Sequence, residues 1–281
     1  MFAARFIGLG FALAALCLPH DAVAGTESGD CTGASFDCAA VGQWNFSVSL
    51  GAGVRTNPLV NGRNIPLVVV PHVSYYGRHF FLDNLDLGVT FCDRPAYSLS
   101  LIATPGADRI FFARNDPQNY FVNYAANSID PTTSPPPQNV VPVPHARQFT
   151  YLAGLEGTVR AGRLSGQLEL LQEVTGRHHG SEIRGAVTLM FTPGGNTVVA
   201  DVGALWKSEA VVGYYYGESA LYDPGSALDP FFRISWKRPL SGHWQLSAFV
   251  NFERLGKSIA DSPIVANSLV TTGFAGATYI F

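Results

Sequence analysis

The feature that most constrains the fold of this chain is a two-residue alternation that recurs along most of its length. In residues 149–160, apolar side chains such as Tyr151 and Leu155 alternate with a second set that includes Glu156 and Arg160. A β-strand points successive side chains to opposite faces, so such a segment has one apolar face and one polar or small face. The same alternation marks residues 44–54, 85–92, 182–191 and 244–253.

Further candidate strands lie between turns rich in Gly and Pro. They are residues 66–76, 95–103, 164–175, 197–206, 210–217, 229–238 and 268–281. The total is about 12 strands, with about 10–12 as the range, and most have the ~9–11 residues that a tilted strand needs to cross a bilayer.

The composition narrows the class of protein. The chain has 281 residues, of which 47% are hydrophobic and only 14% charged, with a net charge of −3. Soluble domains carry about a quarter charged residues. A nucleic-acid-binding protein should show a basic face, and a disordered chain needs low hydrophobicity, so both classes are excluded. Beyond the N-terminus no stretch reaches about 18 apolar residues, which excludes a helical membrane protein with several spans.

The alternation alone fits either a soluble β-sandwich or a transmembrane barrel. In a barrel, the polar face lines the lumen and the apolar face meets lipid. Charged side chains stand in mid-strand on the polar faces here, namely Glu156, Arg160, Glu182, Arg184 and Glu253. These residues are the candidate lumen lining, and their mixed signs favour a lumen filled by paired side chains.

Aromatic side chains and the C-terminus also favour the barrel. Aromatic residues crowd the predicted strand ends, as expected for the headgroup interface: Trp44, Tyr75, Tyr76, Phe80, Phe81, Tyr214, Tyr215, Tyr216, Trp236, Trp244 and Tyr279. The chain ends on a strand whose last residue is Phe281, the usual assembly signal of outer-membrane barrels. The sequence therefore predicts an all-β fold, a transmembrane antiparallel β-barrel closed by this C-terminal strand.

The first 24 residues have the pattern of a cleaved secretory signal peptide. Arg5 precedes an apolar run over residues 6–18, and Ala22-Val23-Ala24 forms a small-residue cleavage site. A membrane anchor is the alternative, but about 13 apolar residues are fewer than a spanning helix needs. We expect an exported protein with a flexible periplasmic segment over residues 25–42 and an outer-membrane barrel over residues 43–281.

Three cysteines remain after the signal peptide. Cys31 and Cys38 could close a small loop in an oxidising compartment, which would leave Cys92 odd, or all three could be unrelated thiols. No spacing among them is that of a metal or redox site. The sequence predicts no catalytic residue, cofactor or metal.

Residues 104–147 interrupt the strand pattern. They contain Asp116-Pro117 and a run from Pro131 to Pro137, which cannot pair as a central strand. With the twelve strands named above and both termini in the periplasm, this Pro-rich loop falls on the periplasmic side. An extra strand around residues 109–113 would move it outside. The loop is interpreted as a solvent loop, with a binding segment as the alternative.

Two short motifs have both a structural and a functional interpretation. His179 and Ser181 share a face if extended, so they could form a lipase pair with Asn196 as third partner, or simply a polar inter-strand turn. Asp261-Ser262-Pro263 is typical of a turn that shapes the last inter-strand loop, and a ligand contact is the alternative. Asp223-Pro224-Gly225 and Asp229-Pro230 are likewise interpreted as loop residues.

The C-terminal third resembles the MipA/OmpV family. The stretch from Arg254 to Val265, which includes Asp261-Ser262-Pro263-Ile264-Val265, is similar to the family motif before the last strand. Tyr215-Tyr216-Gly217-Glu218-Ser219 and residues 44–54 are similar to two further family segments.

The resemblance implies an outer-membrane protein of the MltA-interacting type. It implies a non-enzymatic envelope scaffold that links a murein transglycosylase, which is a murein hydrolase, to a murein synthase. The alternatives are a porin-like passive channel for small solutes or, as a third class, an outer-membrane lipase that uses His179 and Ser181. Expected partners are outer-membrane lipid and these murein enzymes, with no nucleic acid, and the oligomeric state is left open.

Overall fold

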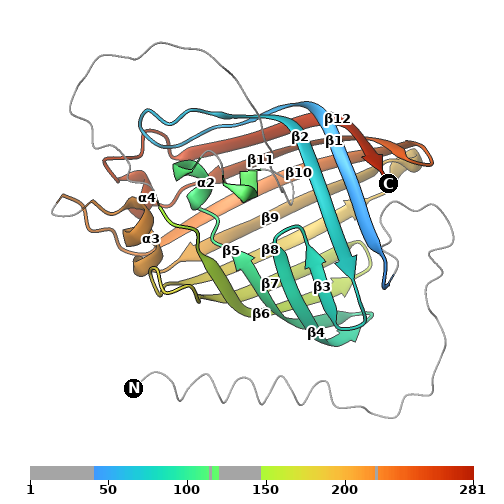
Figure 1. The fold of residues 1–281 in the computed structure, drawn as a ribbon, viewed down its shortest axis with the longest axis horizontal. Coiled ribbons are helices and arrows are strands. Elements are labelled where there is room, and N and C mark those ends of the chain that lie inside the picture. Colours follow the sequence, from blue (N-terminus) through green and yellow to red (C-terminus); the bar gives the residue numbers. More distant parts are fainter. Residues whose placement is uncertain (1–40, 114–115, 120–146, 219–220) are drawn as a thin grey trace. The chain divides into compact units, whose positions relative to one another are not determined.

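The computed structural model describes residues 41–113, 116–119, 147–218 and 221–281. The predicted signal peptide, Cys31, Cys38 and most of the Pro-rich loop lie outside these residues. The described chain forms a closed barrel of twelve strands (Figure 1). In chain order they are β1 (Trp44–Arg55), β2 (Ile65–Tyr76), β3 (Phe80–Asp83), β4 (Asp86–Arg94), β5 (Tyr97–Pro105), β6 (Tyr151–Ala161), β7 (Leu164–Glu173), β8 (Ser181–Phe191), β9 (Thr197–Lys207), β10 (Ala227–Ser241), β11 (Trp244–Arg254) and β12 (Leu269–Ile280).

Every strand pairs antiparallel with its neighbours in sequence, and β1 pairs with β12 to close the barrel. The predicted transmembrane barrel of about 12 strands is thereby confirmed. The closing pair runs from Ser47↔Ile280 to Arg55↔Thr272, and the Phe281 amide donates to the carbonyl oxygen of Phe46 at 3.0 Å. A closed sheet has no free edge at this seam, so backbone groups are paired where water is excluded.

The identity of two strands differs from the sequence prediction, although the total agrees. Residues 210–217 are not a strand, because helix α3 (Glu209–Tyr216) occupies them. Residues 109–113 do not form the extra strand considered for them either, since α2 (Arg109–Phe112) is a helical turn. The twelfth strand, which the sequence analysis did not predict, is the short β3, and it precedes the Pro-rich loop.

This exchange moves the Pro-rich loop to the other end of the barrel. The terminal end, which carries Phe281, has turns of two to five residues: 77–79, 95–96, 162–163, 192–196 and 242–243. The loop end has the segments 56–64, 84–85, 106–150, 174–180, 208–226 and 255–268. One added strand before residue 104 reverses the direction of β5. Of the two sides that the sequence left open for this loop, the strand order supports the one opposite the termini.

The two faces of the strands separate as the alternation predicts. The outer face exposes apolar side chains such as Leu155, Val159, Val187 and Val202. Their neighbours in the chain, including Glu156 and Arg184, lie on the inner face and are less exposed. Within the described ranges no helix is long and apolar enough to cross a membrane.

Cys92 is bonded in a disulfide, so both alternatives considered for it, an odd cysteine and an unrelated thiol, are wrong. It lies in β4 and is buried on the inner face.

Candidate functional site

The inner wall of the barrel carries a row of charged side chains in direct cross-strand register. Glu156 of β6 is paired with Glu169 of β7, which is paired with Arg184 of β8. The Arg184 guanidinium lies 2.9 Å from Glu182 Oε2 and 3.7 Å from Glu169 Oε2. Gln167 Nε2 donates to Glu156 at 2.8 Å. Opposite signs and amides thus pair across the lumen wall, as the mixed charges of the predicted lining suggested.

The other predicted lining residues lie apart from this row. Arg160 stands near the terminal end, where its Nη1 lies 3.7 Å from Asp93 Oδ1 and its side chain is half-exposed. Glu253 lies on β11 between Phe231 and Val270 in register. The structure therefore brings Glu156, Glu182 and Arg184 together, and leaves Arg160 and Glu253 elsewhere on the wall.

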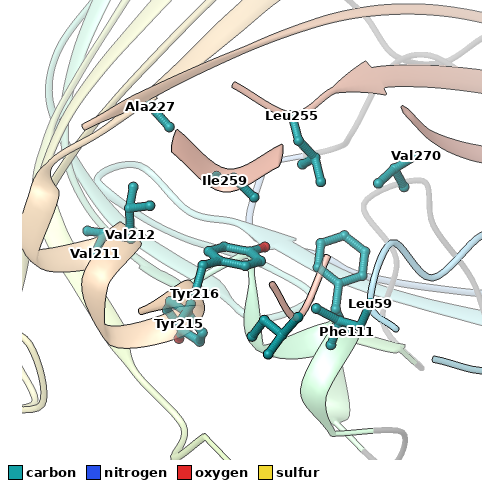
Figure 2. Packing of buried hydrophobic residues seen from close by; sticks show 11 residues of the cluster. Leu59, Phe111, Val211, Val212, Tyr215, Tyr216, Ala227, Leu255, Ile259 and Val270 are labelled. Carbon is teal, nitrogen blue, oxygen red and sulfur yellow. The ribbon is translucent and has the colours of Figure 1, made fainter. Parts of the chain in front are cut away.

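Apolar side chains from several loops pack against one another at the loop end. We call this set the mouth cluster, and Figure 2 shows how its members face each other. It contains Leu59, Phe111, Val211, Val212, Tyr215, Tyr216, Ala227, Leu255, Ile259, Ile264 and Val270. They come from the β1–β2 loop, from α2, α3 and α4 (Lys257–Ala260), and from the strand ends. Burial of such side chains contributes about 1.5–3 kcal/mol each, so the loops hold each other over the lumen.

A buried cation stands next to the mouth cluster. Lys207 Nζ at the end of β9 donates to Asp108 Oδ1 at 2.7 Å and lies 2.7 Å from Asp229 Oδ2. All three side chains are at most 1% exposed. Tyr216 Oη donates to the same Asp108 oxygen, and the Gly256 amide donates to Asp229 Oδ1, each at 2.7 Å. We call these groups the Lys207 centre.

The Lys207 centre ties four segments together. Asp108 precedes α2, Tyr216 ends α3, Asp229 lies in β10, and Gly256 precedes α4. A buried charge is tolerated only when it is paired and hydrogen-bonded, so each segment depends on the others. Sequence reasoning missed Lys207 and Asp108, and assigned Asp229 to a loop. A charged residue that ends an apolar strand was the only available signal.

Two of the three tyrosines of α3 are not interfacial, contrary to the expectation for strand-end aromatic residues. Tyr215 and Tyr216 are completely buried in the mouth cluster. Burial raises the pKa of both phenols, and the Asp108 carboxylate raises that of Tyr216 further. Both therefore stay protonated and can donate hydrogen bonds. Nothing in the alternation distinguished these buried rings from rings at a headgroup interface.

Both ends of the Pro-rich loop are fixed to the mouth. At its start, Phe111 belongs to the mouth cluster, and the neighbouring Arg109 forms an ion pair with the buried Asp116. At its end, Arg147 Nη2 donates to the Tyr215 carbonyl oxygen at 3.2 Å, and its guanidinium lies over the rings of Phe112 and Tyr214. Thr150 shares a 2.9 Å hydrogen bond with Tyr215. The loop therefore leaves and re-enters the barrel beside α3.

The structure separates the residues of the lipase hypothesis. Ser181 Oγ donates to Gln172 Oε1 at 2.7 Å, and His179 is exposed in the preceding loop with φ of 52°. Asn196 lies in the turn after β8, at the terminal end, about 30 Å along the strand from Ser181. Its Oδ1 accepts from Trp236 Nε1 at 3.1 Å. Asn196 therefore does not complete a triad, and the inter-strand-turn interpretation fits this segment.

The Asp261-Ser262-Pro263 motif shapes the last loop, as the turn interpretation predicted. Ser262 is buried, and its Oγ donates to the Tyr216 carbonyl oxygen at 2.7 Å. Asp261 forms an exposed ion pair with Lys257 one helical turn earlier. In the part of the chain that the structure describes, no group of three or more His, Cys, Asp or Glu side chains could hold a metal ion.

Comparisons with known proteins show what this chain is similar to. The family model "MltA-interacting protein MipA" matches residues 25–281. The "MltA-interacting protein" of Escherichia coli (strain K12) is 25% identical over 247 residues, which cover 84% of this chain and 90% of that protein. The "Putative outer membrane protein YiaT" of Escherichia coli O157:H7 is 25% identical over 248 residues, which cover 84% and 91%. Among solved structures, the KdgM porin aligns with 85% of this chain and 99% of its own at 9% identity and a TM-score of 0.37.

Proposed function

The chain belongs to the MltA-interacting protein MipA family and is an outer-membrane β-barrel, and on that premise we propose that it is a non-enzymatic envelope scaffold. Its role is to hold a murein transglycosylase and a murein synthase near each other. The observation that carries the proposal is the mouth cluster, because it closes the lumen at the loop end. A barrel with a closed mouth is suited to presenting a surface rather than to passing solutes.

The surface for these partners is the terminal end. In an outer-membrane barrel the short turns face the periplasm, where murein lies. This end carries exposed basic side chains on four different turns and strand ends: Arg78, Arg94, Arg160, Arg163 and Arg238. Among the described residues, Asp93 is the only acidic side chain near them. We call this set the basic rim. Complementary charge steers association, so the rim fits a partner with an acidic face.

Crosslinking in intact envelopes tests the scaffold. The wild-type protein should capture a lytic murein transglycosylase at low salt and less of it at high salt, because exposed charge pairs are screened. The triple variant Arg78→Glu, Arg94→Glu, Arg163→Glu should lose most of the captured enzyme. The matched control changes three exposed arginines at the loop end to Glu: Arg63, Arg177 and Arg254. Equal capture by both variants, or none by the wild type, would rule out docking at the basic rim.

A passive channel is the competing function, since the inner wall is polar. Planar-bilayer recording separates the two. A clear ohmic step from the wild-type barrel favours the channel, and a barrel without one favours the scaffold.

A further inference from the structure

Inward-facing side chains are buried in the loop half of the barrel and accessible in the terminal half. On β1, Arg55 is 8% exposed, whereas Ser49, on the same face nearer the terminal end, is partly exposed. On β9, Lys207 is 1% exposed, whereas Asp201 on the same face is partly exposed. Gln167 of β7, also inward, is exposed. Solvent therefore reaches the terminal half of the lumen, and the loop half is filled.

The first part of the Pro-rich loop contributes to this filling. Residues 106–113 contain α2, and residues 116–119 contain the short helical turn η2 (Pro117–Asn119). Asp108, Asp116 and Asn119 are at most 1% exposed. Phe111 of α2 points into the mouth cluster (Figure 2). We call residues 106–113 and 116–119 the plug.

The plug is attached to the inner wall on two sides. Asn119 Oδ1 accepts a hydrogen bond from Arg55 Nη1 of β1 at 3.3 Å. Asp108 forms the buried ion pair with Lys207 of β9. In the strand order, β12, β11 and β10 separate β1 from β9. The plug therefore crosses the loop half of the lumen between these two strands.

The plug is folded largely by its own hydrogen bonds. The Ala113 amide donates to the Arg109 carbonyl oxygen at 3.0 Å, and the Asn119 amide donates to that of Asp116 at 2.9 Å. Asn119 Nδ2 also donates to the Ala113 carbonyl oxygen at 3.2 Å. The plug takes no part in the strand pairing that closes the barrel. Its displacement therefore breaks a few side-chain contacts and leaves the wall intact.

Helix α3 packs on the plug. The Phe112 ring contacts those of Tyr215 and Tyr216, with centroid distances of 5.8 and 5.7 Å. Tyr216 Oη also donates to Asp108 of the plug at 2.7 Å. Displacement of the plug removes these aromatic and polar contacts from α3. We therefore expect this side of the mouth cluster to loosen together with the plug.

We propose that the barrel is a plugged channel, in which displacement of the plug opens a path for small hydrophilic solutes along the lumen. The wall of the terminal half is already polar and reached by solvent, and includes Glu156, Gln167 and Asp201. The plug separates this half from the loop end. Conduction is thus a conditional activity beyond the scaffold role, and it uses the lumen rather than the basic rim.

Planar-bilayer recording of the wild-type barrel and two deletion variants tests the plug. One variant lacks residues 107–119, which removes the plug. The control lacks residues 125–137, an equally long stretch of the same loop beyond the plug. The plug deletion should give steady ohmic steps, whereas the wild type and the control deletion should stay closed. A plug deletion that runs as a folded barrel on unheated gels but gives no steps overturns the proposal, and so do equal steps in the control.

A double variant extends the test without shortening the chain. Asp108→Asn with Asn119→Ala weakens both attachments, so it should give transient steps of the amplitude seen in the plug deletion, with at least tenfold more open time than the wild type. Asp223→Asn with Asn267→Ala, at exposed positions of the loop end, is the control and should stay closed. Steps of another amplitude, or equal opening in the control, refute the plug. Steady steps from the wild type refute both the plug and the scaffold, whereas a silent plug deletion refutes the plug alone.

Discussion

Replacement of Lys207 should open the mouth without unfolding the barrel. In Lys207→Met, the side chain keeps its length but loses the ammonium that lies 2.7 Å from both Asp108 and Asp229. Each carboxylate retains one donor, Tyr216 Oη or the Gly256 amide. Removal of one partner from a buried ion pair costs about 3–5 kcal/mol, because the remaining charge is uncompensated. The hydrogen bonds between the strands stabilise the barrel independently of this ion pair, and the substitution does not alter them.

This loss predicts a measurable change in local opening. A cost of about 3–5 kcal/mol corresponds to an opened population roughly 100- to 4,000-fold larger, since each 1.4 kcal/mol is a factor of ten. The α3 amides of Val211 and Val212, which donate to the Ser208 carbonyl oxygen, report on this opening by hydrogen exchange. Their exchange should accelerate by that factor, while amides in β6 and β7 keep their wild-type rates.

Lys257→Met is the matched control. This lysine also pairs with an aspartate, but its side chain is 87% exposed, so its loss should leave α3 exchange unchanged. A further change of Asp108 and Asp229 to Asn in Lys207→Met should restore part of the protection, because neither residue then carries the buried charge that the lysine compensated. Wild-type exchange in Lys207→Met, or equal acceleration in the control, would refute the argument that this lysine holds the mouth closed.

Three other changes probe neighbouring contacts. His178 packs on Tyr214, and its Nδ1 accepts a hydrogen bond from the Gly180 amide. Burial lowers the pKa of His178 below the usual 6.5 despite nearby carboxylates. The protection of α3 amides from hydrogen exchange should therefore fall as the pH drops from about 7.5 to 5.5, and His178→Gln should remove that pH dependence. Arg147→Ala should speed protease cleavage of the Pro-rich loop on intact cells, because it removes the loop's attachment to α3. Gly154→Ala should reduce the folded band on unheated gels, since its Cβ would lie 1.8 Å from the Leu170 carbonyl oxygen.

Each of these has a control and a contrary outcome. The pH dependence is expected because His178 binds its proton more tightly when the loop is unfolded. The same pH dependence of α3 exchange in His178→Gln would contradict this explanation. Arg163→Ala, at the opposite end, should not alter loop cleavage, and equal cleavage in both variants would reject the role of Arg147. Gly213→Ala, with open space at the Cβ position on α3, should be neutral or slightly stabilising; a wild-type yield of folded Gly154→Ala would contradict the steric argument.

The amino-acid sequence alone is enough to assign the two faces of the barrel wall. Alternation has a period of two residues, so Leu155 and Glu156 are assigned to opposite faces wherever the strand lies. The closing strand before Phe281 and the family motif at Asp261-Ser262-Pro263 are also short sequence patterns. Both could be identified without knowledge of any tertiary contact.

The arrangement of the loop end depends on contacts between segments that are far apart in the chain. Four of the eight residues of α3 are buried, namely Val211, Val212, Tyr215 and Tyr216, and their spacing is helical. The Val and Tyr residues nevertheless favour a strand by propensity, and the packing of the loops overrides that preference. Lys207, Asp108 and Asp229 are far apart in the chain and meet only when the barrel closes. The side on which residues 106–150 emerge depends on the four-residue β3, which forms because its neighbours pair with it and not because of its own pattern.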